Sequence, residues 1–125
     1  MDENSLSKEI IGAAIEVHRY LGPGLLESAY QASLSRELSL KNIAFEKEKA
    51  LPLEYKGIKL DCGYKLDFLV EGLVIVELKA VENIIPIHEA QMLTYLKLMN
   101  LKLGLLINVN VRLLKEGIKR IVLGL

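Results

Sequence analysis

The chain lacks several features that would assign it to a specialised class of protein. Its one cysteine, Cys62, cannot form an internal disulfide, which excludes a disulfide-stapled secreted scaffold. Its longest uncharged stretch, near Leu103–Val111, is well short of the roughly 20 apolar residues that a membrane-spanning helix needs. The first residues, Met1–Asn4, are acidic and polar, without the basic-then-apolar pattern of a signal peptide.

Composition indicates a folded chain rather than a disordered one. Hydrophobic residues make up 51% of the 125 residues and charged residues 26%. This apolar fraction can bury enough surface to offset the loss of chain entropy on folding. The length suits one domain, residues 1–125. We therefore expect a soluble, cytoplasmic, single-domain protein with no membrane partner.

Net charge is also absent, but the zero total conceals an uneven distribution. Basic and acidic residues number 16 each, whereas residues 97–125 contain six basic residues against Glu116 alone. The rest of the chain is correspondingly acidic. A basic end beside an acidic body indicates either a polyanion-binding surface next to a cation site or ordinary solubilising side chains.

Apolar spacing predicts three helices. Residues 5–20 have apolar positions at helical intervals, with Ser5 or Ser7 as the cap. Gly22-Pro23-Gly24 ends that helix, and a second helix covers about residues 25–40. The third is predicted for residues 86–100, with Pro86 in its first turn.

Strands are predicted between and after the helices. The alternating residues 43–51 indicate an edge or half-exposed strand, and Leu60–Leu69 a second one. Between them, Tyr55-Lys56-Gly57-Ile58 is a hairpin candidate. Residues 73–81 are apolar on both faces, which is typical of a central strand, and two more strands follow at 103–109 and 117–123. The order α-α-β-β-β-α-β-β predicts an α/β fold in which helices flank a mixed central β-sheet.

Charged residues interrupt the most apolar strand. Glu77 and Lys79 share one of its faces, because residues i and i+2 of a strand point the same way. Asp67 is a third such residue, on the preceding strand. Burying an unpaired charge is costly, so each of them needs a partner, a metal ion or a wet cleft.

The turn between these two strands decides whether the three charges meet. A two-residue loop at 71–72 would turn Asp67 away from Glu77. A three-residue loop at 70–72, with Gly72 in the left-handed position, would place Asp67 opposite Ile75 and on the face of Glu77, as a diagonal neighbour about 7–8 Å away. The glycine in third place favours the longer loop, and hence a carboxylate pair that can share one cation.

Oxygen ligands of this kind select a hard cation such as Mg²⁺ or Mn²⁺, and no Cys/His cluster has zinc spacing. Such a cation polarises a phosphoryl oxygen and generates hydroxide from bound water. Lys79 would orient that water or stabilise the developing negative charge. The other interpretation is a structural ion pair, Glu77–Lys79 or Asp67–Lys79, at the rim of the sheet.

Motifs in this order resemble those of a known nuclease superfamily. Asp67 followed by Glu77-Leu78-Lys79 resembles the D…E-x-K signature of the PD-(D/E)xK nuclease superfamily, with Leu66 in place of the proline. Residues 24–30 read G-x-x-E-x-x-Y and resemble the GxxExxY family, a branch of that superfamily. Gln91-x-x-x-Tyr95 resembles the helix motif that follows E-x-K in exonuclease and RecB-like branches. The resemblance spans about residues 8–123.

The resemblance implies a restriction-endonuclease-like core and Mg²⁺-dependent (or Mn²⁺-dependent) hydrolysis of a nucleic-acid phosphodiester. It makes Asp67 and Glu77 metal-binding and catalytic, and Lys79 the catalytic lysine. Glu27 and the backbone carbonyl of Leu78 would be further metal ligands, Glu27 often through water. Together with the basic end of the chain, the resemblance also predicts a set of substrate-binding residues: Tyr30, Gln91, Tyr95, Lys97, Lys102 and Arg112.

We therefore expect a metal-dependent nuclease, with DNA favoured as its substrate. The alternative is a non-catalytic nucleic-acid-binding or protein-interaction module that retains the fold, and a third interpretation is a purely structural domain. The intact Asp67, Glu77 and Lys79 count against the non-catalytic module. A chain of this length has little room for a separate recognition domain, and a homodimer would supply the missing surface.

Overall fold

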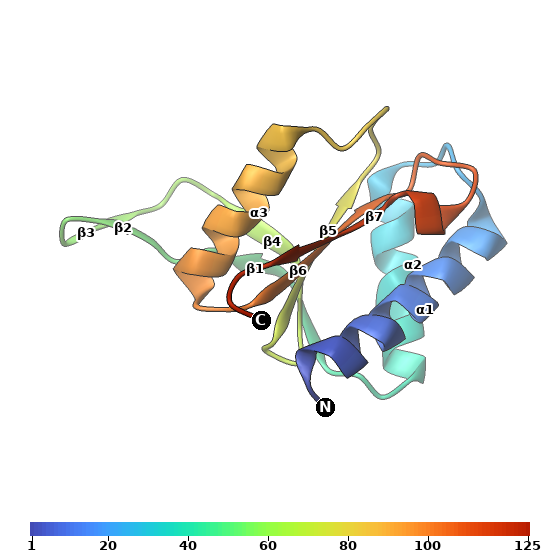
Figure 1. Cartoon of the computed structure of the whole chain (residues 1–125), viewed down its shortest axis with the longest axis horizontal. Coiled ribbons are helices and arrows are strands. Elements are labelled where there is room, and N and C mark those ends of the chain that lie inside the picture. Colours follow the sequence, from blue (N-terminus) through green and yellow to red (C-terminus); the bar gives the residue numbers. More distant parts are fainter.

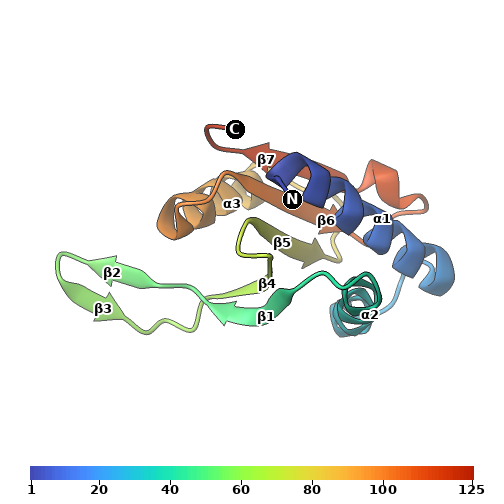
Figure 2. The same ribbon diagram turned by 90° about the horizontal axis from the view of Figure 1, so that it is seen from below.

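The computed structural model describes residues 1–125 as three helices around a five-stranded mixed sheet (Figure 1). The sheet order is β1-β4-β5-β6-β7, in which β5 and β6 are parallel and the other neighbours antiparallel. A short hairpin, β2–β3, stands apart from the sheet (Figure 2). In chain order the elements are α1 (Glu3–Leu21), α2 (Glu27–Leu40), β1 (Phe45–Ala50), β2 (Leu53–Tyr55), β3 (Ile58–Leu60), β4 (Lys65–Val70), β5 (Val74–Lys79), α3 (Pro86–Met99), β6 (Leu103–Asn108), the 3₁₀ turn η1 (Leu114–Glu116) and β7 (Ile118–Val122).

The predicted α/β fold and its order of elements are confirmed, with two adjustments. The hairpin candidate at 55–58 forms β2 and β3 as a small sheet of its own. The strand predicted for 60–69 is divided, since β3 ends at Leu60 and β4 begins at Lys65. None of the three helices combines the length and hydropathy that a membrane-spanning helix requires.

The start of α1 differs from the prediction. Asp2 is the N-cap, and its carboxylate accepts a hydrogen bond from the Ser5 backbone N–H at 2.7 Å. This hydrogen bond lowers the pKa of Asp2. Neither predicted cap serves, because Ser5 lies in the first turn and Ser7 is buried within the helix. An ionised carboxylate at this position also suits the positive end of the helix dipole.

The central strand divides the core into two layers. On β5, Val74, Val76 and Leu78 belong to the cluster that packs beneath α1 and α2, whereas Ile75 belongs to the cluster beneath α3. Alternation along the strand therefore directs Glu77 and Lys79 toward the α3 side. The prediction that residues 73–81 form the central strand is confirmed, since β5 is third of five.

The α3 layer is held close to the sheet at one glycine. Gly104 on β6 has no side chain, and the thioether of the buried Met92 on α3 occupies the space where a Cβ atom would lie. The helix that covers the polar end of β5 is thus fixed in height by a small residue on the neighbouring strand.

We predict that Gly104→Ala lowers the free energy of unfolding by about 1–3 kcal/mol, because Met92 must shift within a packed layer. Urea denaturation measures the change. Gly12→Ala is the matched control: Gly12 lies in α1 with open space around its missing Cβ, so the variant should gain about 0.5–1 kcal/mol. Equal stability of Gly104→Ala and the parent would show that this contact is not tight.

Candidate active site

The turn between β4 and β5 sets the register of the candidate site. The pairs Phe68–Val76, Leu69–Ile75 and Val70–Val74 leave a three-residue loop at 71–73. Both predicted registers are wrong: the loop has the expected length but begins one residue later. Glu71 and Gly72 both adopt left-handed backbone angles, with φ of 53° and 65°. The observed register brings Asp67 level with Glu77, closer than the diagonal arrangement expected from the sequence.

Carboxylates replace the backbone ladder where the two strands part. Beyond the Phe68–Val76 pair, the Asp67 N–H donates to Oε2 of Glu77 at 2.7 Å. The Leu78 N–H donates to Oδ2 of Asp67 at 2.8 Å. Each carboxylate thus spends one oxygen on the backbone of the opposite strand. Asp67 and Glu77 lie side by side, and each has a second oxygen with no protein donor.

The pair is electrostatically unfavourable in the free protein. Burial and, next to it, the neighbouring Asp67 charge raise the pKa of Glu77 from 4.5 to about 7, against the opposing effects of the Asp67 N–H and of Lys79. Burial likewise raises the pKa of Asp67, against the opposing effect of the Leu78 N–H. Glu77 is only 6% exposed. Two acids in contact, one buried and one half-buried, favour a proton or a cation between them.

Lys79 follows on the same face of β5 but does not neutralise the pair. The protein has four ion pairs within 4.0 Å, and none of them involves Lys79, Asp67 or Glu77. The structural ion pair considered from the sequence is therefore absent. Lys79 is half-buried and lowers the pKa of both carboxylates from a longer distance.

Glu27 reaches the site from the first turn of α2. Its Oε1 accepts a hydrogen bond from the Ala80 N–H at 2.9 Å, directly after Lys79. Its charge raises the pKa of both Asp67 and Glu77, as expected of a nearby acid. The three acidic residues predicted from the sequence are thus brought to one end of β5.

Tyr30 has a different position from the one predicted. It is 1% exposed, which is incompatible with the predicted contact to substrate. Its hydroxyl donates to the Gly22 carbonyl at 2.5 Å and accepts from the Leu25 N–H at 3.1 Å. Tyr30 is a positioning residue: it holds the connector from which α2, and with it Glu27, begins.

The predicted helix residues Gln91 and Tyr95 lie on α3, on the same side of the sheet as the carboxylates. Burial raises the pKa of Tyr95, and the Glu77 charge raises it further, so this hydroxyl lies within electrostatic range of the acidic pair. Gln91 is half-buried one turn earlier and makes no hydrogen bond to Lys79 or to the carboxylates.

The three basic residues predicted to bind substrate do not surround this site. Lys102 directly precedes β6, whose Leu103 pairs with Val74, so Lys102 lies at the opposite end of β5 from Lys79. Lys97 is exposed in the last turn of α3, toward that same far end. Arg112 does follow β6 at the near end, but it lines a cavity against α1. Charge counted along the chain does not indicate which end of a sheet it occupies.

Asn108 is a residue whose role the sequence analysis missed. It is 3% exposed at the end of β6, opposite Lys79. Its side-chain amide donates to the Val81 carbonyl at 2.8 Å and accepts from the Val81 N–H at 3.2 Å. The adjacent Val109 N–H donates to the Lys79 carbonyl. The sequence signal for this role was the position of Asn108: it is a polar residue at the end of a fully buried strand that lies beside the E-x-K strand.

The donor set is of the type that hard cations bind, although the protein groups alone do not complete a site. The free oxygens of Asp67 and Glu77 are adjacent hard ligands. No group of three or more His, Cys, Asp or Glu side chains lies close enough to hold a metal ion. A cation here would therefore rest on the carboxylate pair and take its other ligands from water or backbone, in keeping with the habits of Mg²⁺.

The fold and this constellation agree with a comparison of the sequence with known families. The family model described as the PD-(D/E)XK nuclease superfamily matches residues 4–121. The chain belongs to this superfamily, whose members generally use divalent metal ions and act on nucleic acid. No curated protein and no solved structure shows significant similarity to the chain.

We predict that Glu77→Gln changes how stability depends on pH. The folded state keeps a proton on Glu77 up to about pH 7, whereas the unfolded chain releases it near 4.5, so wild-type stability falls as pH rises through this window. Glutamine does not ionise, and its carbonyl can still accept from Asp67. In metal-free buffer at pH 8 the variant should therefore be more stable by roughly 2 kcal/mol.

Thermal or urea unfolding across pH 4–8.5 tests this expectation. Glu82→Gln is the matched control, since Glu82 is exposed in the loop after β5 and should leave the pH profile unchanged. Parallel pH profiles for wild type and Glu77→Gln would contradict the proposed origin of the shift.

We predict that Tyr30→Phe loosens the connector that positions Glu27. Loss of the hydroxyl leaves the Gly22 carbonyl and Leu25 N–H without their partner, which should cost about 1–2 kcal/mol of stability. Amide hydrogen exchange should accelerate at Leu25 and at Ala80, the residue that Glu27 holds. Tyr20→Phe, at an 88% exposed tyrosine, should change neither quantity. Unaltered exchange at Ala80 in Tyr30→Phe would show that the Glu27–Ala80 hydrogen bond does not depend on the contacts of Tyr30 with the connector.

Proposed function

We propose that this chain is a divalent-metal-dependent nuclease of the GxxExxY branch, which hydrolyses nucleic-acid phosphodiester bonds with DNA as its favoured substrate. The observation that carries the proposal is the Asp67–Glu77 pair: a half-buried and a buried acid side by side, each with one oxygen free and neither in an ion pair. A purely structural pair would be expected to have a cationic partner in contact.

In this proposal Asp67 and Glu77 hold Mg²⁺ or Mn²⁺ through their free oxygens. Glu27, through water, and the backbone carbonyl of Leu78 complete the ligands. When bound, the ion supplies Lewis acidity toward a phosphoryl oxygen and lowers the pKa of water. Cation binding favours ionised Glu77, which is otherwise about half protonated near pH 7.

Lys79 stabilises negative charge that develops on the phosphate during attack. Its ammonium has no carboxylate within 4.0 Å and so remains available to an anion. Backbone bonds fix the segment around it: Val109 binds the Lys79 carbonyl, Asn108 binds Val81, and Glu27 binds Ala80. Tyr95 and Gln91 on α3 form the wall beside the carboxylates and approach the substrate.

We predict that a panel of labelled DNA and RNA substrates is cleaved with Mn²⁺ or Mg²⁺, and that Lys79→Ala lowers the rate by about 10²–10³-fold. Lys102→Ala is the matched control, because Lys102 carries the same charge at the other end of the sheet. Its rate should stay within about twofold of wild type. Calorimetric titration with Mn²⁺ should show a site that Asp67→Asn abolishes.

The outcomes separate the alternatives. Equal cleavage by wild type and Lys79→Ala would indicate a contaminating nuclease. No cleavage of any substrate, with nucleic-acid binding retained and no Mn²⁺ site, would favour the non-catalytic module. The homodimer expected from the small size of the chain stays a prediction, which light scattering of the purified protein tests.

A further inference from the structure

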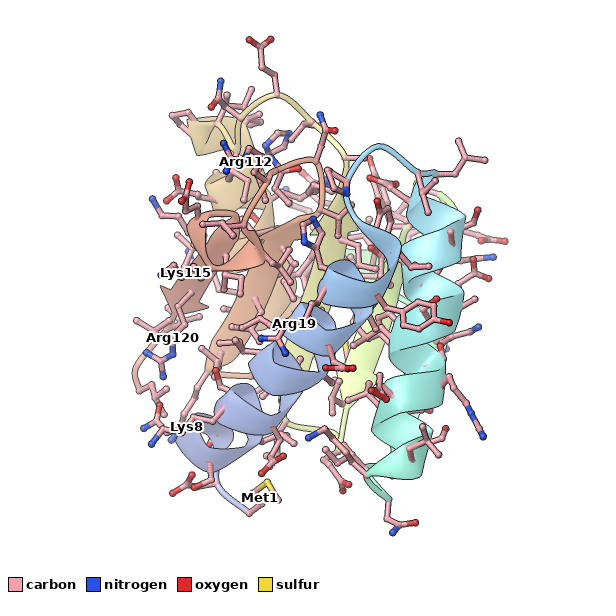
Figure 3. All side chains as sticks on the ribbon, turned by 90° about the vertical axis from the view of Figure 1, so that its right-hand side faces the viewer. Met1, Lys8, Arg19, Arg112, Lys115 and Arg120 are labelled. Carbon is pink, nitrogen blue, oxygen red and sulfur yellow. The ribbon has the colours of Figure 1, made fainter.

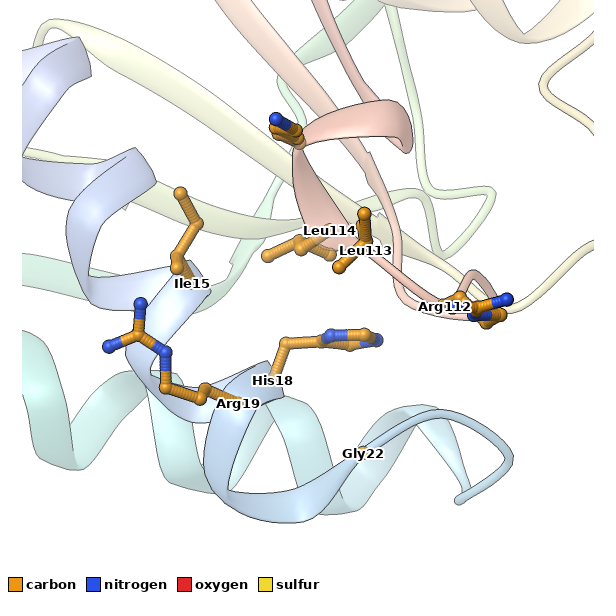
Figure 4. A pocket seen from close by; sticks show the side chains of 8 residues that line it. Ile15, His18, Arg19, Gly22, Arg112, Leu113 and Leu114 are labelled. Atoms are coloured by element: carbon orange, nitrogen blue, oxygen red, sulfur yellow. The ribbon is translucent and has the colours of Figure 1, made fainter.

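The largest cavity of the protein lies away from the carboxylate pair. It has a volume of about 510 Å³ and lies between the last turns of α1 and the segment 112–115, which joins β6 to β7 (Figure 4). We call it the α1 cavity; Ile15, His18 and Arg19 line it on one side, and Arg112, Leu113 and Lys115 on the other. Neither the proposed catalytic residues nor the predicted metal ligands contribute to it.

The α1 cavity carries positive charge without compensation. Two arginines, a lysine and a histidine line it, and no lining residue is acidic. Arg112 and Lys115 form no ion pair. Arg19 has one, with Glu16 at 3.9 Å, and both side chains are more than half exposed, so it contributes little. Figure 3 shows Arg19, Arg112 and Lys115 on one face of the molecule, with Lys8 and Arg120 farther along it.

Helix capping explains only part of this cluster. His18 and Arg19 lie in the last turn of α1, where basic residues suit the negative end of the helix dipole, and the His18 ring is 3.0 Å from the Val109 carbonyl. Arg112 and Lys115 belong to the facing segment and have no such role. Their presence around a cavity whose charged lining residues are all basic therefore needs another explanation, and an anion supplies it.

Size and lining restrict the kind of anion. The volume greatly exceeds that of one phosphate group and falls in the range of small-molecule sites, about 300–1,000 Å³. Ile15, Leu113 and Leu114 provide apolar surface next to the bases. This combination suits a ligand with a phosphate at one end and a flat, weakly polar body at the other.

We propose that the α1 cavity binds a phosphorylated nucleotide, with Arg112 and Lys115 on the phosphate and the base against Ile15 and Leu113. The choice of a nucleotide rests on the proposed function, whereas the anion site itself does not. Two sources share this chemistry: a free nucleotide and the phosphorylated end of a strand. The second source is within structural reach, because Val109 contacts His18 of the cavity with its carbonyl and Lys79 with its N–H.

The test is calorimetric titration of the full chain in EDTA-containing buffer, so that no probe is cleaved. Adenosine 5′-monophosphate should bind at least about tenfold more tightly than adenosine, with inorganic phosphate as the anion-only probe. Arg112→Gln/Lys115→Gln should weaken binding of the monophosphate by about tenfold or more. The control Lys8→Gln/Arg36→Gln removes the same charge from exposed positions outside the cavity and should stay within about twofold.

Amide chemical-shift changes on adding the monophosphate should map to residues 15–22 and 112–115. Equal affinity for adenosine, no loss in Arg112→Gln/Lys115→Gln, or no binding at about 10 mM would overturn the proposal. A 5′-phosphorylated oligodeoxynucleotide that binds more tightly than the monophosphate would assign the site to a strand end, and the reverse order to a free nucleotide. Lys79→Ala should bind the monophosphate as tightly as wild type. Binding to the α1 cavity and nuclease activity are therefore tested independently, and failure of one proposal can be told apart from failure of the other.

Discussion

The structure depends on two acids that replace a piece of β-ladder. Where β4 and β5 part, the Asp67 and Leu78 N–H groups would be buried without partners, and the side chains of Glu77 and Asp67 accept them. Buried backbone donors must be satisfied, so these carboxylates have a structural role in addition to any role in binding a ligand. The cost is a pair of neighbouring negative charges in a poorly hydrated place, which raises the pKa of both. The fold thus creates one fixed position at which binding of a cation or a proton is favoured.

The elements around that point hold the short segment after Glu77 from both sides. Glu27 from α2 binds Ala80, while Asn108 and Val109 at the end of β6 bind Val81 and Lys79. Tyr30 in turn fixes the connector before α2. The G-x-x-E-x-x-Y and E-x-K motifs, far apart in the sequence, therefore form one hydrogen-bonded unit. Rigidity of this kind is what an electrostatic site needs, because groups that are already in place need no reorganisation when a charge develops.

The sequence was sufficient for features that arise from burial and periodicity, and insufficient for those that arise from individual hydrogen bonds. Charges inside an apolar strand identified Asp67, Glu77 and Lys79, and uniform apolarity identified the central strand. The register was missed because Glu71, a residue that seldom adopts positive φ, does so here and shifts the loop by one residue. Tyr30 and Asn108 were misjudged or missed because a buried hydroxyl or amide reveals its partners only once distant segments meet. Family resemblance supplied Glu27, which its position on the helix alone would have left as a solvent-exposed acid.

The uneven charge along the chain acquires a meaning only in three dimensions. The bases of the last 29 residues do not form one surface: Lys97 and Lys102 lie toward the far end of β5, whereas Arg112 and Lys115 lie at the end that carries Lys79. An acidic pair by itself repels a nucleic-acid backbone, so attraction must come from elsewhere on the same end of the molecule. Arg112 and Lys115 lie on the α1 side, in the lining of the cavity that also contains His18. His18 is linked to Lys79 through the backbone of Val109. With bases and acids on the two sides of this end of the sheet, a polyanion would be held by Arg112 and Lys115. Its phosphate would approach Asp67 and Glu77 only when a cation is bound between them.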